Sequence, residues 1–141
     1  MSGNPKDLYK TVILEHNKNP QNYSKREDAQ QMLDAYNPVC GDHFKLYFDL
    51  NDGIISKLSF HGYGCAISKA SASILTDLLE GKTLDEVERV HQDLQQILEG
   101  KGDAEVHPEV LLAFEPVLDH PGRLKCVTLC WEALQKFAST I

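Results

Sequence analysis

The feature that most constrains the fold is a pair of segments with regularly spaced apolar residues, joined by Asn-Asp-Gly at residues 51–53. The first segment has an apolar residue at every second position, the period of a strand with one buried face: Phe44, Leu46, Phe48 and Leu50. The second segment, residues 54–61, places Ile54, Leu58 and Phe60 on one face. Together the segments predict an antiparallel hairpin.

The connection determines how the two strands pair. Asp-Gly at residues 52–53 is typical of a two-residue hairpin turn, but that register would mix the apolar and polar faces. A three-residue loop pairs Leu50 with Ile54 and keeps the apolar residues together. The same register pairs Leu46 with Leu58 and Phe44 with Phe60. We therefore predict a three-residue loop with Gly53 at positive φ.

Helical patterns lie on both sides of the hairpin. Before the hairpin, the sequence predicts a helix with Asn4 as cap that runs to about His16 and a strand over 32–36. After it, the sequence predicts a helix that begins after Cys65 and ends at Gly81, and a helix that runs from a capping box at Thr83–Glu86 to Gly100. A short helix from Pro108 to Phe114 and a final helix from Leu124 follow. Loops are expected at about 101–107 and 116–122. This order predicts an α+β domain, with a small antiparallel sheet of about three strands and helices packed on one face.

Length and charge exclude several classes of protein. The 141 residues suffice for one domain with a core. The net charge of −7, without a basic cluster, argues against direct nucleic-acid binding. No apolar run is long enough to span a bilayer, and the first residues lack the apolar stretch of a signal peptide, so we expect no membrane association and a cytoplasmic location.

The four cysteines are the main candidates for chemistry, because thiols in a reducing compartment are more often metal ligands or reactive groups than disulfides. Cys40 lies in Asn-Pro-Val-Cys-Gly-Asp at residues 37–42, one residue from Asp42. Cys65 and Cys126 fall at predicted helix starts after glycine-containing loops, where exposed N–H groups favour a thiolate. Cys130 lies in an apolar stripe and is expected to pack as a small hydrophobe, although it is one helical turn after Cys126.

Cys40, Asp42, Cys65 and Cys126 would supply three sulfurs and one oxygen, a tetrahedral set suited to zinc. Their spacing matches no short zinc motif, and a surface turn with an incidental cysteine is the alternative for residues 37–42. The shared context of the three cysteines favours a metal or redox site. Arg123 and Lys125 beside it either balance nearby negative charge or are ordinary solvated cations. His43 and His61 are weaker candidates.

Three stretches resemble the IscU/NifU-like iron–sulfur cluster assembly family. They are residues 37–42, the Gly-Tyr-Gly-Cys-Ala-Ile-Ser-Lys-Ala-Ser-Ala-Ser segment at 62–73, and Arg-Leu-Lys-Cys-Val-Thr-Leu-Cys-Trp at 123–131. The SufU branch is the most similar, because Lys125 stands where the IscU scaffold has a histidine and because residues from about 81 to 108 resemble the SufU-type insertion. The resemblance implies one SufE/NifU-like domain over residues 1–141.

The resemblance also implies a mechanism. It implies that Cys40, Asp42, Cys65 and Cys126 bind zinc and that Cys40 accepts persulfide sulfur from a SufS-type cysteine desulfurase, after a partner side chain replaces it at the metal. The chain would then be a sulfur-transfer partner rather than a stand-alone enzyme, with a downstream cluster scaffold as a further partner. Cys130 departs from the family, in which a small apolar residue is usual.

Two other functions remain open from the sequence. The same residues would hold iron or an iron–sulfur cluster if the protein were itself an assembly scaffold. A structural zinc module with no transfer role is a third hypothesis. The glycine-rich setting of Cys65 and the exposure expected for Cys40 argue against it, since structural zinc sites are closed.

Overall fold

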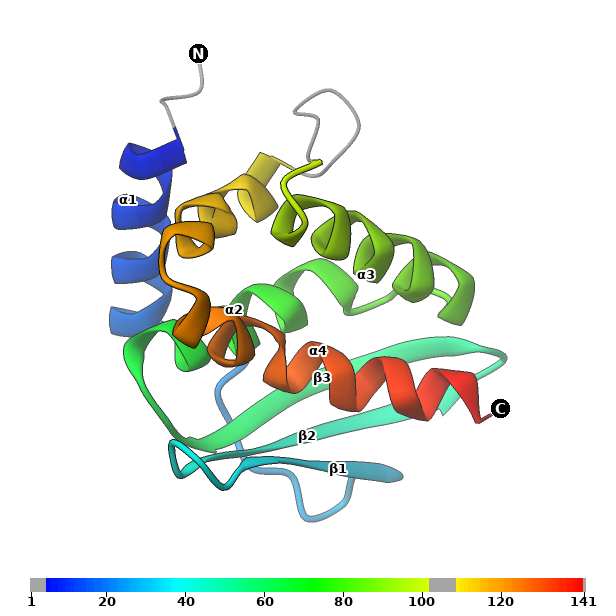
Figure 1. The fold of residues 1–141 in the computed structure, drawn as a ribbon. Coiled ribbons are helices and arrows are strands. Elements are labelled where there is room, and N and C mark those ends of the chain that lie inside the picture. The colour runs from blue at the N-terminus through cyan, green and yellow to red at the C-terminus, as the bar shows by residue number, and fades with distance from the viewer. Residues whose placement is uncertain (1–4, 102–108, 141) are drawn as a thin grey trace.

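The computed structural model describes residues 5–101 and 109–140, and it contains a three-stranded sheet covered on one face by helices (Figure 1). The elements are α1 (Pro5–Lys18), β1 (Gln31–Asn37), β2 (Asp42–Asn51), β3 (Ile54–Tyr63), α2 (Ala66–Leu79), α3 (Leu84–Leu98), the 3₁₀ helices η1 (Glu109–Asp119) and η2 (Pro121–Arg123), and α4 (Leu124–Ser139). The strands lie in the order β1–β2–β3, and both neighbouring pairs are antiparallel. The predicted α+β class is confirmed.

The hairpin register differs from the prediction. Asn51 pairs with Ile54, so the turn has two residues, and the three-residue loop is wrong. Asp52 and Gly53 both adopt left-handed φ angles, 53° and 75°, as a two-residue turn with the twist of its strands requires. Gly53 was therefore assigned correctly to positive φ. The predicted pairs Leu46–Leu58 and Phe44–Phe60 are also wrong, because Leu46 pairs with Phe60 and Phe44 with Gly62.

A β-bulge reconciles the short turn with a single buried face. Tyr47 pairs with Ser59 but Asp49 pairs with Ser56, so two residues of β3 lie opposite one residue of β2. Lys57 has a φ of 53° at this point. The extra residue changes which side chains of β3 point inward. Near the turn Ile55 is buried and Ile54 is 40% exposed, contrary to the prediction, whereas Leu58 and Phe60 beyond the bulge are buried as expected.

The core fills the space between the sheet and the helices. Its largest fully buried side chains include Trp131, Phe44, Phe48, Phe60, Phe114, Leu46, Ile55, Leu58, Ile74 and Leu75. A buried hydrogen-bond chain joins α2 to α4: Trp131 Nε1 donates to Ser71 Oγ (3.0 Å), and the Ser71 hydroxyl donates to the carbonyl of Val127 (2.6 Å). Because each of these helices carries a candidate cysteine near its start, this chain helps to position the site.

Two of the predicted boundaries need correction. Helix α1 ends at Lys18 rather than at about His16, and the loop expected at 116–122 is wrong because η1 continues through Pro116 to Asp119. Leu111, Phe114 and Val117 are buried at a spacing of three, which is the period of a 3₁₀ helix. The proposed cap Asn4, the proposed helix start at Pro108, and residues 102–107 of the loop expected at 101–107 lie outside the described residues. The capping box of Thr83 and Glu86 is confirmed.

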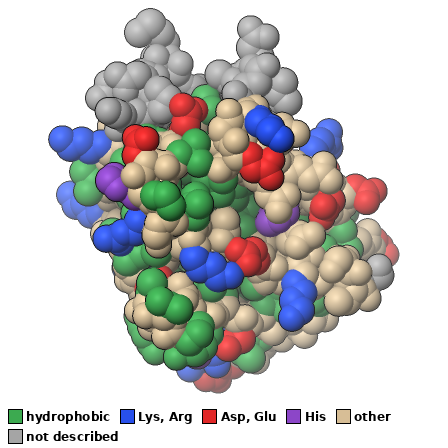
Figure 2. Space-filling model, in the orientation of Figure 1, with side chains coloured by type: hydrophobic (Ala, Val, Ile, Leu, Met, Phe, Trp, Pro, Cys, Tyr) green, Lys and Arg blue, Asp and Glu red, His purple; other side chains and the backbone are tan. Residues whose placement is uncertain are grey.

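The surface shows mixed charge. On the face in Figure 2, the Lys and Arg side chains of the described residues lie scattered among Asp and Glu rather than in one continuous basic patch. Among the described helices, none combines the length and the apolar character needed to cross a membrane.

Candidate metal centre

Cys40 and Asp42 lie at the turn between β1 and β2. Asn37 stabilises the turn, because its Oδ1 accepts a hydrogen bond from the N–H of Val39 (3.1 Å) and its carbonyl accepts one from the N–H of Gly41 (2.7 Å). Gly41 has a φ of 78°, a conformation that glycine adopts without steric cost. The turn leaves Cys40 exposed, whereas Asp42, the first residue of β2, is buried.

Cys65 is the N-cap residue of α2, as the sequence predicts for a helix start. Its sulfur accepts a hydrogen bond from the N–H of Ser68 (3.4 Å), and its own N–H donates to Asp42 Oδ1 (3.1 Å). Gly64 makes room for this contact, since a Cβ at that position would lie 2.6 Å from the Phe44 ring and 3.0 Å from Asp42 Oδ1. The glycine before Cys65 therefore brings the start of α2 against Asp42.

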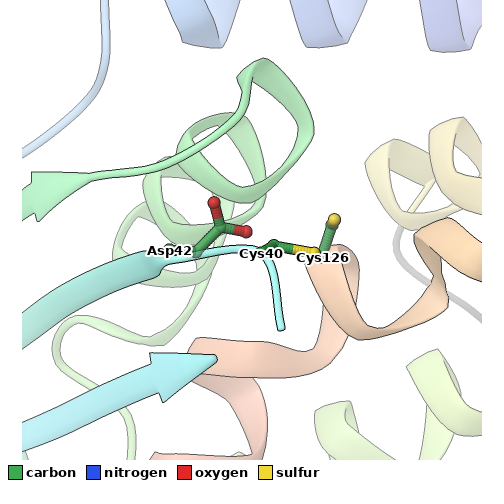
Figure 3. A group of neighbouring side chains, drawn as sticks. All are labelled: Cys40, Asp42 and Cys126. Carbon is green, nitrogen blue, oxygen red and sulfur yellow. The ribbon is translucent and has the colours of Figure 1, made fainter. Parts of the chain in front are cut away.

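The four predicted ligands line one cavity of about 530 Å³. The sulfurs of Cys40 and Cys126 and a carboxylate oxygen of Asp42 all lie within 4.8 Å of one another. In Figure 3, Cys40 extends from its turn toward the first turn of α4, where Cys126 is located. Cys65 lines the same cavity but is not one of the three residues whose ligand atoms lie this close to one another. Three thiol sulfurs and one carboxylate oxygen are a donor set that fits a zinc ion.

The thiols at the two helix starts have pKa shifts in opposite directions. Burial raises the pKa of Cys65, but hydrogen bonds with the side chain and backbone of Ser68 and with Cys126 outweigh it, so the pKa lies below its ordinary value of 9.0. Burial, together with the neighbouring Cys65, raises the pKa of Cys126 to about 11. Of this pair, Cys65 is therefore the thiol that ionises first.

Ser68 is a residue of the site that the sequence reasoning missed. It is buried, and its hydroxyl donates to Asp42 Oδ2 at 2.7 Å while its N–H contacts Cys65. A signal was present in the sequence: Ser68 follows the N-cap by three residues, and at this position the backbone N–H meets the capping side chain.

The two cations near Cys126 differ in their placement. Arg123 lines the cavity. Lys125 is not among the lining residues, and its Nζ lies 2.8 Å from Glu132 Oε1 in a half-exposed ion pair. Arg123 is thus the cation of this pair that is able to act on a negative charge in the cavity.

The remaining candidates lie away from the cavity. Cys130 belongs to the hydrophobic core, as expected, and burial raises the pKa of its thiol to about 12. His43 pairs with Asp34 (2.6 Å), and His61 stacks on Tyr23. Neither histidine lines the cavity.

Comparisons with known proteins show the family to which the chain is similar. Residues 8–136 match the family described as the NifU-like N terminal domain. The zinc-dependent sulfurtransferase SufU of Bacillus subtilis is 36% identical over 130 residues, which cover 92% of this chain and 88% of that protein. The iron–sulfur cluster assembly scaffold protein IscU of Thermotoga maritima is 28% identical over 131 residues, covering 93% and 92%.

Solved structures show the same fold. A Fervidobacterium islandicum AW-1 protein, described as an iron–sulfur cluster assembly scaffold for the SUF system, superimposes with a TM-score of 0.83 and 30% identity, covering 92% of this chain and 96% of that one. The N-terminal part of a NifU-like protein from Brucella abortus superimposes with a TM-score of 0.78 at 24% identity, covering 93% and 92%. The second similarity concerns the fold alone.

Proposed function

This chain belongs to the NifU-like N-terminal domain family of iron–sulfur cluster assembly proteins, and we propose that it is a zinc-dependent sulfur-transfer protein. In this proposal, Cys40 accepts persulfide sulfur from a SufS-type cysteine desulfurase. The observation that carries the proposal is an exposed Cys40 thiol whose sulfur lies within 4.8 Å of Asp42 and Cys126 at the mouth of a cavity that Cys65 also lines. The most similar relative reported above is itself named a zinc-dependent sulfurtransferase.

Cys40, Asp42, Cys65 and Cys126 would hold the zinc ion. When bound, zinc supplies a positive charge that keeps coordinating thiols deprotonated at neutral pH. Asp42 accepts hydrogen bonds from two donors, and a carboxylate oxygen also lies within 4.8 Å of the Cys40 and Cys126 sulfurs. The buried Cys126 needs such a charge, since its thiol has a raised pKa.

The transfer itself is a thiol–disulfide type of exchange. The Cys40 thiolate attacks the outer sulfur of the desulfurase persulfide, and a new S–S bond forms on Cys40 as the S–S bond on the desulfurase breaks. The desulfurase cysteine leaves as a thiolate with the bonding electron pair, so no oxidant or reductant is needed. Exposure suits Cys40 to this role because the attacking sulfur must reach another protein.

A second candidate function is that of a scaffold on which an iron–sulfur cluster is assembled. The IscU relatives carry that name, and cysteine with carboxylate ligation also suits iron. Lys125, at the position of the scaffold histidine, is paired with Glu132 and does not line the cavity. This placement favours sulfur transfer, with a separate scaffold as a downstream partner.

We further propose that residues from about 81 to 108 form the SufU-type inserted segment. Its described part contains α3, from which no residue lines the cysteine cavity. The segment would therefore affect partner choice or stability rather than sulfur chemistry.

Anaerobic purification followed by metal analysis and desulfurase kinetics tests the function. The zinc-loaded protein should raise the turnover of its cognate desulfurase several-fold, and Cys40→Ala should abolish that stimulation. Cys130→Ala is the matched control, because it removes a thiol from the core without touching the cavity. Absence of stimulation by the zinc-loaded wild type would reject sulfur transfer. A cluster reconstituted at stoichiometric iron and passed to an apoprotein would support the scaffold instead.

A further inference from the structure

The first turn of α2 contains a closed set of hydrogen bonds around Ser68. The Ser68 side chain is buried, and its hydroxyl donates to Asp42 Oδ2 at 2.7 Å. The Ser68 N–H donates to Cys65 Sγ at 3.4 Å, and the Cys65 N–H donates to Asp42 Oδ1 at 3.1 Å. Two of the proposed metal ligands are therefore bound to each other through one serine.

Cys40 has a different environment. Its sulfur accepts or donates no hydrogen bond among the described residues, and its side chain is exposed. The turn that carries it is held by the backbone and side chain of Asn37, and these contacts fix the loop rather than the thiol. Within the ligand set, Asp42 and Cys65 are thus held by hydrogen bonds that involve Ser68, whereas Cys40 is exposed and is not held by Ser68.

We propose that Ser68 is a positioning residue that holds Asp42 and Cys65 in place, so that Cys40 is released from the metal more readily than either of them, an inference that rests on the proposed function. Ser68 directs one oxygen of Asp42 and the sulfur of Cys65 into a fixed geometry, so these two donors lose little freedom when a metal is bound. Cys40 is exposed and has no such restraint from Ser68. Cys40 thus differs from Asp42 and Cys65 in how the protein holds its side chain, and this difference determines how readily each ligand is released.

A purely structural role for Ser68 makes a different prediction. As a buried residue in the first turn of a helix, it would then affect stability alone, as other buried serines of α2 do. Ser73 provides the matched control. It is also fully buried on α2, and its hydroxyl contacts His16 and the N–H of Gln21 away from the cysteine cavity.

The test uses the zinc-loaded full chain and two readouts besides desulfurase activity. Zinc affinity is measured by competition with a chromophoric chelator, and the order in which the cysteines react with iodoacetamide is measured by peptide mass spectrometry. In wild type, Cys40 should be alkylated well before Cys65. Ser68→Ala should weaken zinc binding about 10-fold and bring the alkylation rate of Cys65 close to that of Cys40. Ser68→Thr, which keeps the hydroxyl, should restore the wild-type order.

Control variants separate this role from a general loss of packing. Ser73→Ala should change thermal stability without changing zinc affinity or the alkylation order. If Ser68→Ala does not fold, the isosteric pair Ser68→Thr and Ser68→Val isolates the hydroxyl and is judged by the same two measurements. An unchanged alkylation order in the Ser68 deletion variant, or the same change in Ser73→Ala, would overturn the proposal. A failure of sulfur transfer itself would appear separately, as a zinc-loaded wild type that does not stimulate the desulfurase.

Discussion

Cys126 and Cys130 lie one turn apart on α4, and both are 3% exposed, yet they belong to different parts of the molecule. Cys126 faces the cavity with its sulfur within 4.8 Å of Cys40 and Asp42. Cys130 packs in the hydrophobic core. Burial raises the pKa of both thiols, to about 11 and about 12. Burial and pKa therefore do not separate a candidate ligand from a core cysteine, whereas the neighbouring side chains do.

The largest difference between the two positions is expected in metal affinity. Cys126→Ala removes one of four donors that converge on the cavity, and zinc binding should weaken by about 100-fold or more. Competition titration with a chelator measures this loss. If Cys126→Ala retained wild-type affinity, Cys126 would be a buried neighbour of the site rather than a ligand.

Cys130→Ala tests the other side of the comparison. Removal of one buried sulfur should lower the free energy of unfolding by about 1 kcal/mol and leave zinc affinity unchanged. Urea denaturation of the zinc-free protein measures the stability, and the same chelator titration measures the metal. A fall in zinc affinity comparable to that of Cys126→Ala would place Cys130 in the site.

The smallest effect is expected in the pH dependence of the free energy of unfolding, to which the buried His91 contributes. His91 on α3 is buried, and burial lowers its pKa below 6.5, although Glu88 and Glu132 oppose this shift. As the pH falls through 6.5, the unfolded chain binds a proton that the folded chain does not, so the folded state loses stability until the folded pKa is reached. Above pH 6.5 this contribution is constant.

The variant His91→Gln removes this titration. Between pH 7 and pH 5, wild type should lose more stability than the variant in urea denaturation measured at constant ionic strength. Equal losses would show that His91 takes up its proton with an ordinary pKa, and that its surroundings on α3 are less closed than its burial indicates.

The sequence predicted those features whose signals are local. Alternating apolar residues located β2, and the glycines before Cys65 and the pattern after it located the start of α2. The capping box of Thr83 and Glu86 was equally local. Because three cysteines share such settings, the sequence predicts that they lie together with Asp42, and all four line one cavity; their role as metal ligands stays a prediction.

The errors came from features whose cause is tertiary. The apolar pattern predicts a three-residue turn only if the strands are regular. The bulge at Lys57 has no local signal, because lysine rarely adopts positive φ. Pro116 predicts an interruption of the helix, but the 3₁₀ helix η1 continues through it and Phe114 is buried. Ser68 was missed because its role depends on Asp42, which is distant in sequence.

Gly64 lies between the cysteine cavity and the hydrophobic core, and a Cβ atom at this position would contact both. A side chain there would meet the Phe44 ring, which is fully buried in the core, and at the same time the carboxylate of Asp42. Any substitution at Gly64 must therefore displace either core packing or a proposed ligand. A change to the metal or the width of the cavity therefore cannot start with a substitution of Gly64 unless the core around Phe44 is also redesigned.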